Sequence, residues 1–281
     1  MADILKLQRI ATQVRRDIIR MTANAQSGHP GGSLGSADFL TALYFEILQH
    51  NPKNFNQNGN GHDMFFLSNG HISPLWYSVL ARNGYFPIEE LGTFRKLHSR
   101  LQGHPCNVYN LPGIYISSGS LGQGLSVACG AALAKKMNND PHLVYTLHGD
   151  GELQEGQIWE SAMFAAAKKI DNLISTVDWN NQQIDGTVES VMPLKDLAAK
   201  WQSFGWTVVH MQGNDMNDVI DKINEAKSLT GKGKPVIILM KTEMGQGVDF
   251  MTGTNAWHGK VTNAEQTEKA LAQLEETLGD Y

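Results

Sequence analysis

The sequence predicts an α/β protein whose mostly parallel central sheet is flanked by helices. From about residue 140 onward, short apolar runs alternate with longer stretches of helical character. The runs are LVYTL (143–147), LISTV (173–177), WTVVHM (206–211) and PVIILM (235–240). Uninterrupted apolar runs are typical of strands that are buried on both faces, and their alternation with helices indicates βαβ units.

Segments before residue 140 extend this pattern. The apolar run MFFL (64–67) predicts a fifth strand. Ahead of it, apolar residues recur at helical spacing and predict a helix that Ser36 caps. These residues are Leu40, Leu43, Tyr44, Ile47 and Leu48. The polar, turn-rich segment 51–63 is expected to form a surface loop.

The end of the sequence predicts one more helix. Thr262 and Glu265 have the spacing of a capping box. Leu271, Leu274 and Leu278 follow at helical spacing. We expect this helix to contribute packing only.

Composition and charge exclude several classes of function. The 281 residues carry a net charge of −5 without long runs of one sign, which argues against a nucleic-acid surface or a membrane-binding basic face. We expect no signal peptide, and no apolar stretch is long enough to span a bilayer. The two cysteines, Cys106 and Cys129, make neither a disulfide framework nor a metal cluster, so we expect a cytoplasmic protein.

Polar residues and glycines follow directly after four of the five predicted strands. They are SNGH (68–71), HGDG (148–151), DWNN (178–181) and KTEMGQG (241–247). In parallel α/β sheets, ligands bind outside the carboxyl ends of the strands. We therefore expect the functional residues to lie in these segments.

Asp150 and Asn180 are candidates for a metal site. They are thirty residues apart, about one strand–helix–strand step, and are expected at the ends of neighbouring strands. One carboxylate and one amide oxygen suit Mg²⁺, which commonly shares its sites between protein oxygens and substrate phosphates. A Gly-Asp-Gly triplet alone is more often a plain turn, and the pairing with Asn-Asn carries the prediction.

The spacing of these two motifs resembles the thiamin-diphosphate signature, and further motifs resemble transketolase in order along the chain. They are SGHPGGSLGSADFL (27–40), LSNGHISPLWYSVL (67–80), LHSRLQGHP (97–105), GSLGQGLSVACGAAL (119–133) and KTEMGQG with WHG (241–259). The resemblance implies a three-layer thiamin-diphosphate-binding fold, with residues 1–281 as a single diphosphate-binding domain. It also implies that Asp150, Asn180 and the main-chain carbonyl of Gln182 hold Mg²⁺, for which Ca²⁺ or Mn²⁺ can substitute.

The same resemblance assigns the remaining site residues. His29, His71, His104 and His258 are expected to contact substrate and exchange protons with it, although any one of them taken alone would be read as an ordinary loop histidine. The cofactor contacts are expected from His71, His104, Gly119, Ser120, Leu121, Gly151, Asn180 and His258. Gly119, Ser120 and Leu121 are expected to open a helix of small residues, for which close helix–sheet packing is an alternative interpretation.

Other histidines are treated separately. His62 lies in the polar loop and is expected to tolerate substitution, while His148 has no assigned role. A zinc site built from several histidines is disfavoured, because the loops lack the short ligand spacings of such sites.

Only the amino-terminal part of transketolase is matched. The chain therefore resembles the amino-terminal subunit of a split enzyme that transfers a two-carbon ketol unit from a ketose phosphate to an aldose phosphate. We expect a carboxyl-terminal partner subunit, with two copies of each in the assembly, and no activity from this chain alone. Glu155 and Glu160 resemble interface glutamates, but they are equally well read as solvated helix charges.

Two alternatives remain open at this point. One is a subunit of another thiamin enzyme, similar to deoxyxylulose-phosphate synthase or to a 2-oxoacid dehydrogenase. The other is a non-catalytic module that binds thiamin diphosphate. The sequence does not name the sugar substrates, which depend on residues expected in the partner.

Overall fold

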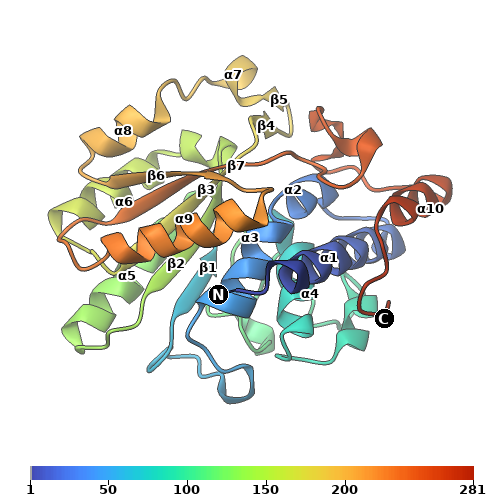
Figure 1. Cartoon of the computed structure of the whole chain (residues 1–281), viewed down its shortest axis with the longest axis horizontal. Helices are drawn as coiled ribbons and strands as arrows, with labels where there is room; N and C mark the ends of the chain where they lie inside the picture. The colour runs from blue at the N-terminus through green and yellow to red at the C-terminus, as the bar shows by residue number, and fades with distance from the viewer. Residues whose placement is uncertain (1) are drawn as a thin grey trace.

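The computed structural model, which describes residues 2–281, is built on a five-stranded parallel sheet. Its strands lie in the order β1 (Met64–Leu67), β2 (Val144–Gly149), β3 (Leu173–Trp179), β7 (Val236–Lys241) and β6 (Thr207–Gln212) (Figure 1). These are the five strands that the apolar runs predict. Because β2 and β3 are neighbours, their carboxyl ends carry the HGDG and DWNN segments side by side.

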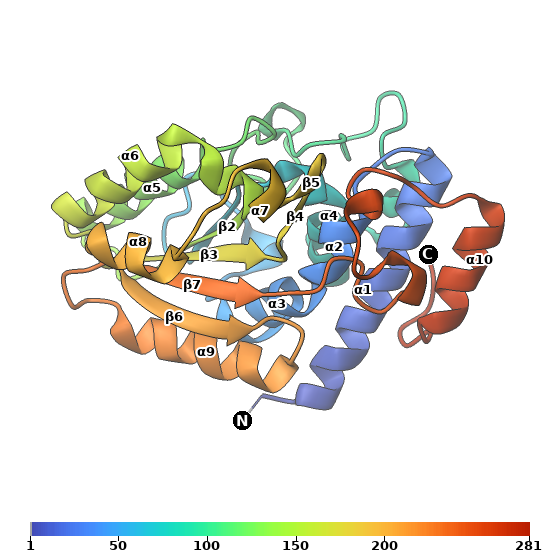
Figure 2. The same ribbon diagram turned by 90° about the horizontal axis from the view of Figure 1, so that it is seen from above.

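Helices cover both faces of the sheet and make a three-layer molecule (Figure 2). One layer contains α1 (Ile4–Ala25), α3 (Ala37–Ala42), α4 (Ser73–Arg82) and α9 (Met216–Leu229); the other contains α5 (Gly124–Met137), α6 (Gly156–Ala167) and α8 (Leu197–Ser203). Alternate residues of β7 enter different cores: Ile238 joins the first layer, whereas Ile237 and Leu239 join the second. Continuous apolar runs are needed because both faces of the sheet are buried.

Strand β6 departs from the expectation that every strand is buried on both faces. Val209 and Met211 are buried against α9, but His210 and Gln212 are exposed. The reason is position: β6 is an edge strand, and only one of its faces is fully covered by a helix. Edge strands commonly carry polar side chains on the face that remains open to solvent.

The predicted helix start at Ser36 is confirmed for α3, whose N-cap residue is Ser36, but helical structure also precedes it. Helical structure begins at α2 (Pro30–Gly35), and it continues through α3 into a π-helical turn (Leu43–Ile47). Ser36 makes no side-chain capping bond. Gly31 in α2 allows close packing, since a Cβ atom there would lie 2.8 Å from both Met244 Cγ and the Trp257 carbonyl oxygen.

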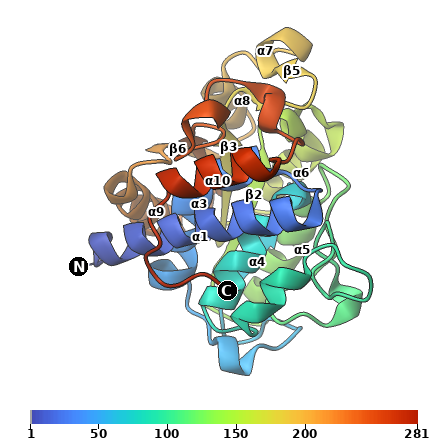
Figure 3. The same cartoon turned by 90° about the vertical axis from the view of Figure 1, so that its right-hand side faces the viewer.

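The last helix begins one residue later than predicted. Asn263 and Gln266 form the capping box of α10 (Ala264–Gln273), in place of Thr262 and Glu265. Leu278 lies beyond the helix with 49 % of its surface exposed, so the apolar series does not continue to it. The segment after α10 instead runs back along α1, beside which α10 also packs (Figure 3).

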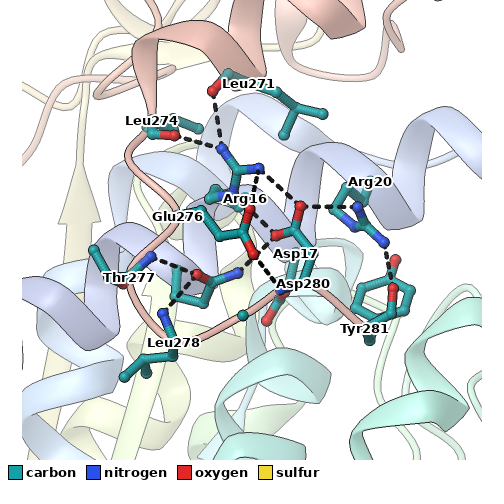
Figure 4. A network of polar contacts seen from close by, with 12 residues as sticks. Arg16, Asp17, Arg20, Leu271, Leu274, Glu276, Thr277, Leu278, Asp280 and Tyr281 are labelled. Carbon is teal, nitrogen blue, oxygen red and sulfur yellow. Dashed lines mark hydrogen bonds and ion pairs between the residues drawn. The ribbon is translucent and has the colours of Figure 1, made fainter.

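Charged side chains fasten this terminal segment to α1 (Figure 4). The Asp280 carboxylate accepts hydrogen bonds from Arg16, Arg20 and Gln13. The guanidinium of Arg20 also lies 4.6 Å from the centre of the Tyr281 ring.

A small excursion lies above the carboxyl end of the sheet. After β3 the chain forms a hairpin of β4 (Gln182–Gln183) and β5 (Gly186–Thr187), followed by α7 (Val188–Val191). Within residues 2–281, none of the helices combines the length and the apolar character that crossing a membrane requires.

Candidate active site

A cavity of about 380 Å³ opens at the carboxyl ends of β1, β2 and β3. Its walls come from segments that are far apart in the sequence: the start of α2, the turns after these three strands, the loop before α5, and residues 244 and 258. This is the edge of the sheet where the pattern of strands and polar turns predicts a ligand site.

Four histidines gather on one side of this cavity. His29 lies at the centre of the group, and its ring centre is 5.2 Å from that of His71, 5.7 Å from that of His258 and 6.3 Å from that of His104. The rings of His71 and His258 are 5.1 Å apart. All four line the cavity, so the structure brings together every histidine that the sequence singles out as catalytic.

Local structure explains how these rings come to lie together. His29 is the residue at the amino end of α2, and His71 sits in a single 3₁₀ turn (Gly70–Ile72) directly after β1. His258 follows another such turn (Asn255–Trp257). His104 packs against Gly119, where a Cβ atom would lie 3.2 Å from the imidazole and where φ is +146°.

The histidine rings are held in their neutral form. Burial lowers the pKa of His29 to about 4, with smaller effects from His258, Arg95 and His104. Burial also lowers the pKa of His71 well below its ordinary value, and it lowers the pKa values of His104 and His258. A neutral imidazole offers one donor and one acceptor. The Nδ1 atoms of His29 and His258 are buried without a hydrogen-bond partner in the protein, so they are available to a ligand.

Asp150 lines the same cavity and directly follows the end of β2. Its Oδ1 accepts a hydrogen bond from the Gly151 amide at 2.7 Å, and its Oδ2 accepts one from the Asn181 amide at 2.5 Å. The acid therefore touches the Asn-Asn segment after β3, as the predicted neighbouring strand ends require. Burial, followed by repulsion from Asp178, raises the pKa of Asp150 to about 8. A cation bound at this carboxylate would compensate for both effects.

Asn180 is oriented by its neighbours. Its amide nitrogen donates to Asp178 Oδ2 at 3.0 Å, which leaves the amide oxygen on the other side, where it accepts from the Gln182 amide at 2.9 Å. Asp178 is completely buried and also accepts a hydrogen bond from the Thr242 hydroxyl. The orientation of the Asn180 oxygen is thus set by a buried acid at the end of the same strand.

These oxygens fit a hard divalent cation. One carboxylate, one amide oxygen and the main-chain carbonyl of Gln182 make a small oxygen set, which Mg²⁺ commonly completes with water and phosphate oxygens. Across residues 2–281, no three His, Cys, Asp or Glu side chains are placed to hold a metal together. A metal at this site would therefore depend on amide and carbonyl oxygens.

The turn from Gly119 to Leu121 differs from its prediction. It does not open a helix, because α5 begins only at Gly124 and the φ values of Gly119 (+146°) and Gly122 (+83°) lie in the region that favours glycine. Gly119 and Leu121 line the cavity, whereas Ser120 is exposed and lies outside it. The alternative interpretation of close helix packing holds for Ala128 but fails for Gly130, where a Cβ atom would meet nothing within 4 Å.

Several residues of the cavity were not predicted. They are Gly32, Asn69, Gly149, Glu152, Gln154, Asp178, Gln183, Ile184 and Met244. Asn69 and Asp178 lie in the segments after β1 and β3, so the strand-end rule contained a signal for them. Gln183 and Ile184 enter only because the β4–β5 hairpin folds back over the sheet. The Asn69 Oδ1 and Gln183 Nε2 atoms are buried without a partner.

The remaining candidates have separate places. His148 is completely buried and its Nε2 pairs with the Thr146 hydroxyl at 2.6 Å, which places it in the core behind the cavity. His62 is buried away from the cavity. Glu155 is exposed at the cavity rim, and Glu160 is exposed on α6.

Comparison with known proteins identifies the family. Residues 7–279 match the family described as transketolase, thiamine diphosphate binding domain. The chain belongs to the transketolase family. It is 40 % identical over 271 residues to the 6-deoxy-6-sulfo-D-fructose transketolase subunit of Clostridium sp., covering 96 % of this chain and 97 % of that protein. It is 37 % identical over 272 residues to an apulose-4-phosphate transketolase subunit of Actinobacillus succinogenes, covering 96 % of each.

Solved structures agree with this assignment. The transketolase of Campylobacter jejuni, which is 35 % identical, superposes with a TM-score of 0.88 over 98 % of this chain. The match covers only 43 % of that longer protein. This transketolase chain therefore corresponds in length to the separate subunits and to less than half of the longer enzyme.

Proposed function

We propose that the chain is the amino-terminal subunit of a split transketolase. In this proposal it binds thiamin diphosphate and a divalent metal ion, and together with a partner subunit it transfers a two-carbon ketol unit from a ketose phosphate to an aldose phosphate. The observation that carries the proposal is one cavity that is lined both by four clustered histidines with lowered pKa values and by the Asp150–Asn180 pair. A module that only binds a diphosphate would not need those histidines.

The metal and the cofactor would be held by different parts of the cavity. Asp150, Asn180 and the Gln182 carbonyl would bind Mg²⁺, and Gly151 would let a diphosphate approach the main chain. When bound, thiamin diphosphate supplies the carbanion chemistry of ketol transfer. The unpartnered atoms of Asn69 and Gln183 in the same cavity are further hydrogen-bonding groups for these ligands.

The histidines would act on the sugar. Because their pKa values are lowered, His29, His71, His104 and His258 stay neutral near pH 7 and can each donate one hydrogen bond and accept another. Such groups orient the hydroxyls of a ketose and exchange protons with an alkoxide as it forms. Neutral imidazoles also avoid placing four positive charges in one small cavity.

The proposed assembly rests on the names of the relatives and on an exposed face of this chain. The neighbouring helices α5 and α6 carry exposed apolar side chains: Val127 is 39 % exposed, Met163 53 % and Phe164 42 %. Glu160 lies on the same helix as the last two, and Glu155 connects this face to the cavity rim. We propose that a second copy of the chain covers this face, giving an assembly with two copies of each subunit.

We propose a class of sugar substrates that is broader than the substrate named for any one relative. Two of the similar subunits are named for 6-deoxy-6-sulfo-D-fructose and for apulose 4-phosphate, which differ in their anionic group. We therefore propose a phosphorylated or similarly anionic ketose as the donor.

Since Cys106 and Cys129 are free thiols, a cytoplasmic site of action fits the structure.

The decisive experiment reconstitutes the enzyme. The chain is mixed with a candidate partner subunit that carries the missing catalytic section, with thiamin diphosphate and Mg²⁺, and ketol transfer between ketose and aldose phosphates is measured. We expect transfer from the mixture and none from either protein by itself. Turnover by this chain alone, or transfer only with pyruvate as the donor, would overturn the proposal. Calorimetry with thiamin diphosphate and with ATP separates cofactor binding from nucleotide binding.

A further inference from the structure

Glu152 is a buried acid that the proposed chemistry does not use. Its side chain is inaccessible to solvent, yet it accepts hydrogen bonds from three separate segments of the chain. The donors are the Ser68 hydroxyl after β1, the Gly122 amide in the loop before α5 at 2.8 Å, and the Gly149 amide at the end of β2 at 3.1 Å.

Each of these segments carries residues of the proposed cofactor site. Ser68 begins the turn that ends in His71, and Gly122 directly follows Leu121. Gly149 directly precedes Asp150. The Glu152 carboxylate therefore connects two parts of the site. One is the end of β2, which leads into Asp150, and the other is the 119–122 loop, whose main chain would contact the cofactor.

The packing around Glu152 leaves little freedom for these connections. Ser68 Oγ donates to Glu152 and also accepts a hydrogen bond from the Gly124 amide at 3.1 Å. Gly124 is the first residue of α5. A Cβ atom at Gly124 would lie 2.9 Å from Ser68 Cα, so only glycine allows the loop to approach this closely. The loop before α5 is thus held by side-chain and main-chain contacts that converge on one acid.

Only a carboxylate satisfies this set of donors. All three partners donate hydrogen atoms, and glutamine would turn one acceptor oxygen into a donor that faces an N–H or O–H group. His148 extends the buried network: its Nδ1 lies 3.7 Å from Glu152 Oε1, and its Nε2 pairs with the Thr146 hydroxyl, which pairs with Ser175 at 2.7 Å. The unassigned histidine therefore lies directly behind the acid.

We propose that Glu152 is a positioning residue, which fixes the spacing between the 119–122 loop and Asp150 that bound thiamin diphosphate with its metal requires. This inference rests on the proposed function, because it concerns the same cavity. Outer groups of this kind commonly change ligand affinity by about 10- to 100-fold when they are replaced. The role is distinct from that of the metal ligands, since Glu152 supports them without touching the metal.

The test compares two buried acids in the same chain. Asp17 on α1 is also inaccessible to solvent and also accepts a hydrogen bond from a serine, Ser78, but it lies outside the cavity. The pairs Glu152→Gln and Asp17→Asn, and Ser68→Ala and Ser78→Ala, are therefore matched variants. For each, the dissociation constant of thiamin diphosphate at saturating Mg²⁺ is measured by calorimetry on the assembled enzyme, and the melting temperature is measured separately.

We expect Glu152→Gln to raise the dissociation constant about tenfold and Ser68→Ala to raise it by a smaller factor in the same direction. Asp17→Asn and Ser78→Ala should lower the melting temperature while changing the constant less than about twofold. Hydrogen exchange on the ligand-free chain gives an independent readout, because the amides of residues 119–124 should exchange faster in Glu152→Gln and not in Asp17→Asn.

Each result decides the inference. If Glu152→Gln lowers only the melting temperature, with affinity and loop exchange unchanged, Glu152 is merely structural and the inference is wrong. If Glu152→Gln does not fold, Ser68→Ala gives the same comparison through a milder change. If the wild-type enzyme does not bind thiamin diphosphate at all, the proposed function fails, while loop exchange still shows whether Glu152 holds the 119–122 segment.

Discussion

Two regions of this molecule bury polar side chains, and they treat them differently. Along α1 and the terminal segment the acids are paired: Asp17 binds Arg82, and Asp280 accepts hydrogen bonds from Arg16 (Figure 4), so the unpartnered buried atoms of these described segments are limited to Arg20 Nε and the Tyr281 hydroxyl. In the cavity, atoms of His29, Asn69, Gln183 and His258 are buried without partners.

This difference distinguishes polar groups that stabilise the folded chain from polar groups that are free to bind a ligand. A buried polar atom without a partner costs about 1–3 kcal/mol, so a cluster of such atoms in one cavity lowers stability unless something binds there. A buried ion pair that is fully hydrogen-bonded contributes little net stability, but removing one partner is costly. Substitutions in the cavity should therefore change binding and spare the fold, and substitutions along α1 should do the opposite.

The largest effect is expected at Asp150. Asp150→Asn removes the only carboxylate of the proposed metal set and should weaken Mg²⁺-dependent binding of thiamin diphosphate by at least about 100-fold. Replacing residues that only support metal ligands already lowers affinity by about 10- to 100-fold, and loss of a ligand itself should have at least the larger effect. Because burial raises the pKa of this acid to about 8, losing its charge should offset part of the cost of turning an oxygen that accepts from the Gly151 or Asn181 amide into a donor, so the free energy of unfolding of the ligand-free chain should fall by less than in Arg82→Ala. Calorimetry and urea unfolding of the same variant test both halves. Undiminished cofactor affinity would remove Asp150 from the metal site.

The next largest effect is expected along α1, and it should appear in the free energy of unfolding and not in cofactor affinity. Arg82→Ala leaves the carboxylate of Asp17 buried without its cation and should lower the free energy of unfolding by about 3–5 kcal/mol. Cofactor affinity at a temperature where the variant is folded should stay unchanged. A loss of affinity as large as that of Asp150→Asn would show that the two regions are coupled, and the comparison would fail.

Catalysis should respond to His29 more than to any histidine outside the cavity. Since His29 is the ring that neighbours all three others, His29→Ala should lower kcat/KM for ketol transfer by about 100-fold, the lower end of what a proton-transferring side chain contributes. His62→Ala serves as the control, because His62 is buried away from the cavity and should leave kcat/KM unchanged. Equal losses from both substitutions would count against a role for the histidine cluster.

The sequence predicts the sheet and the proximity of Asp150 and Asn180 for a physical reason. Strands that are buried on both faces must be continuously apolar, and the residues that end them stand out as the first polar ones. Asp150 and Asn180 follow two such strands one βαβ step apart, so their proximity follows from the local pattern alone. Strand β6 is the exception: β1 at the opposite edge of the sheet is fully buried, whereas His210 and Gln212 of β6 are exposed.

Long-range packing was less predictable. The close packing of Gly31 and Gly124 depends on Met244 and Ser68, which are distant in sequence, so no local pattern singles these two glycines out. The helix start at Thr262 was misplaced by one residue for a related reason, since several residues nearby could cap and only the tertiary fold selects among them. Glu152 escaped notice because its three donors come from three different segments.

The smallest effect is expected in the pH dependence of the free energy of unfolding, and it tests the cavity histidines directly. The pKa of His29 is about 4 in the folded chain and near 6.5 when it is unfolded. Between these values the unfolded chain binds a proton that the folded chain does not, so the free energy of unfolding falls as the pH falls from 6.5 toward 4. Urea unfolding of the ligand-free chain at pH 7 and pH 5 should show this loss, and His29→Gln should reduce it by less than the effect of Arg82→Ala. The residual loss in that variant comes from the other cavity histidines, whose pKa values are lowered for the same reason. An identical pH dependence in the wild type and in His29→Gln would mean that this ring is no less easily protonated in the folded chain than in water, and the neutral cluster would lose its central member.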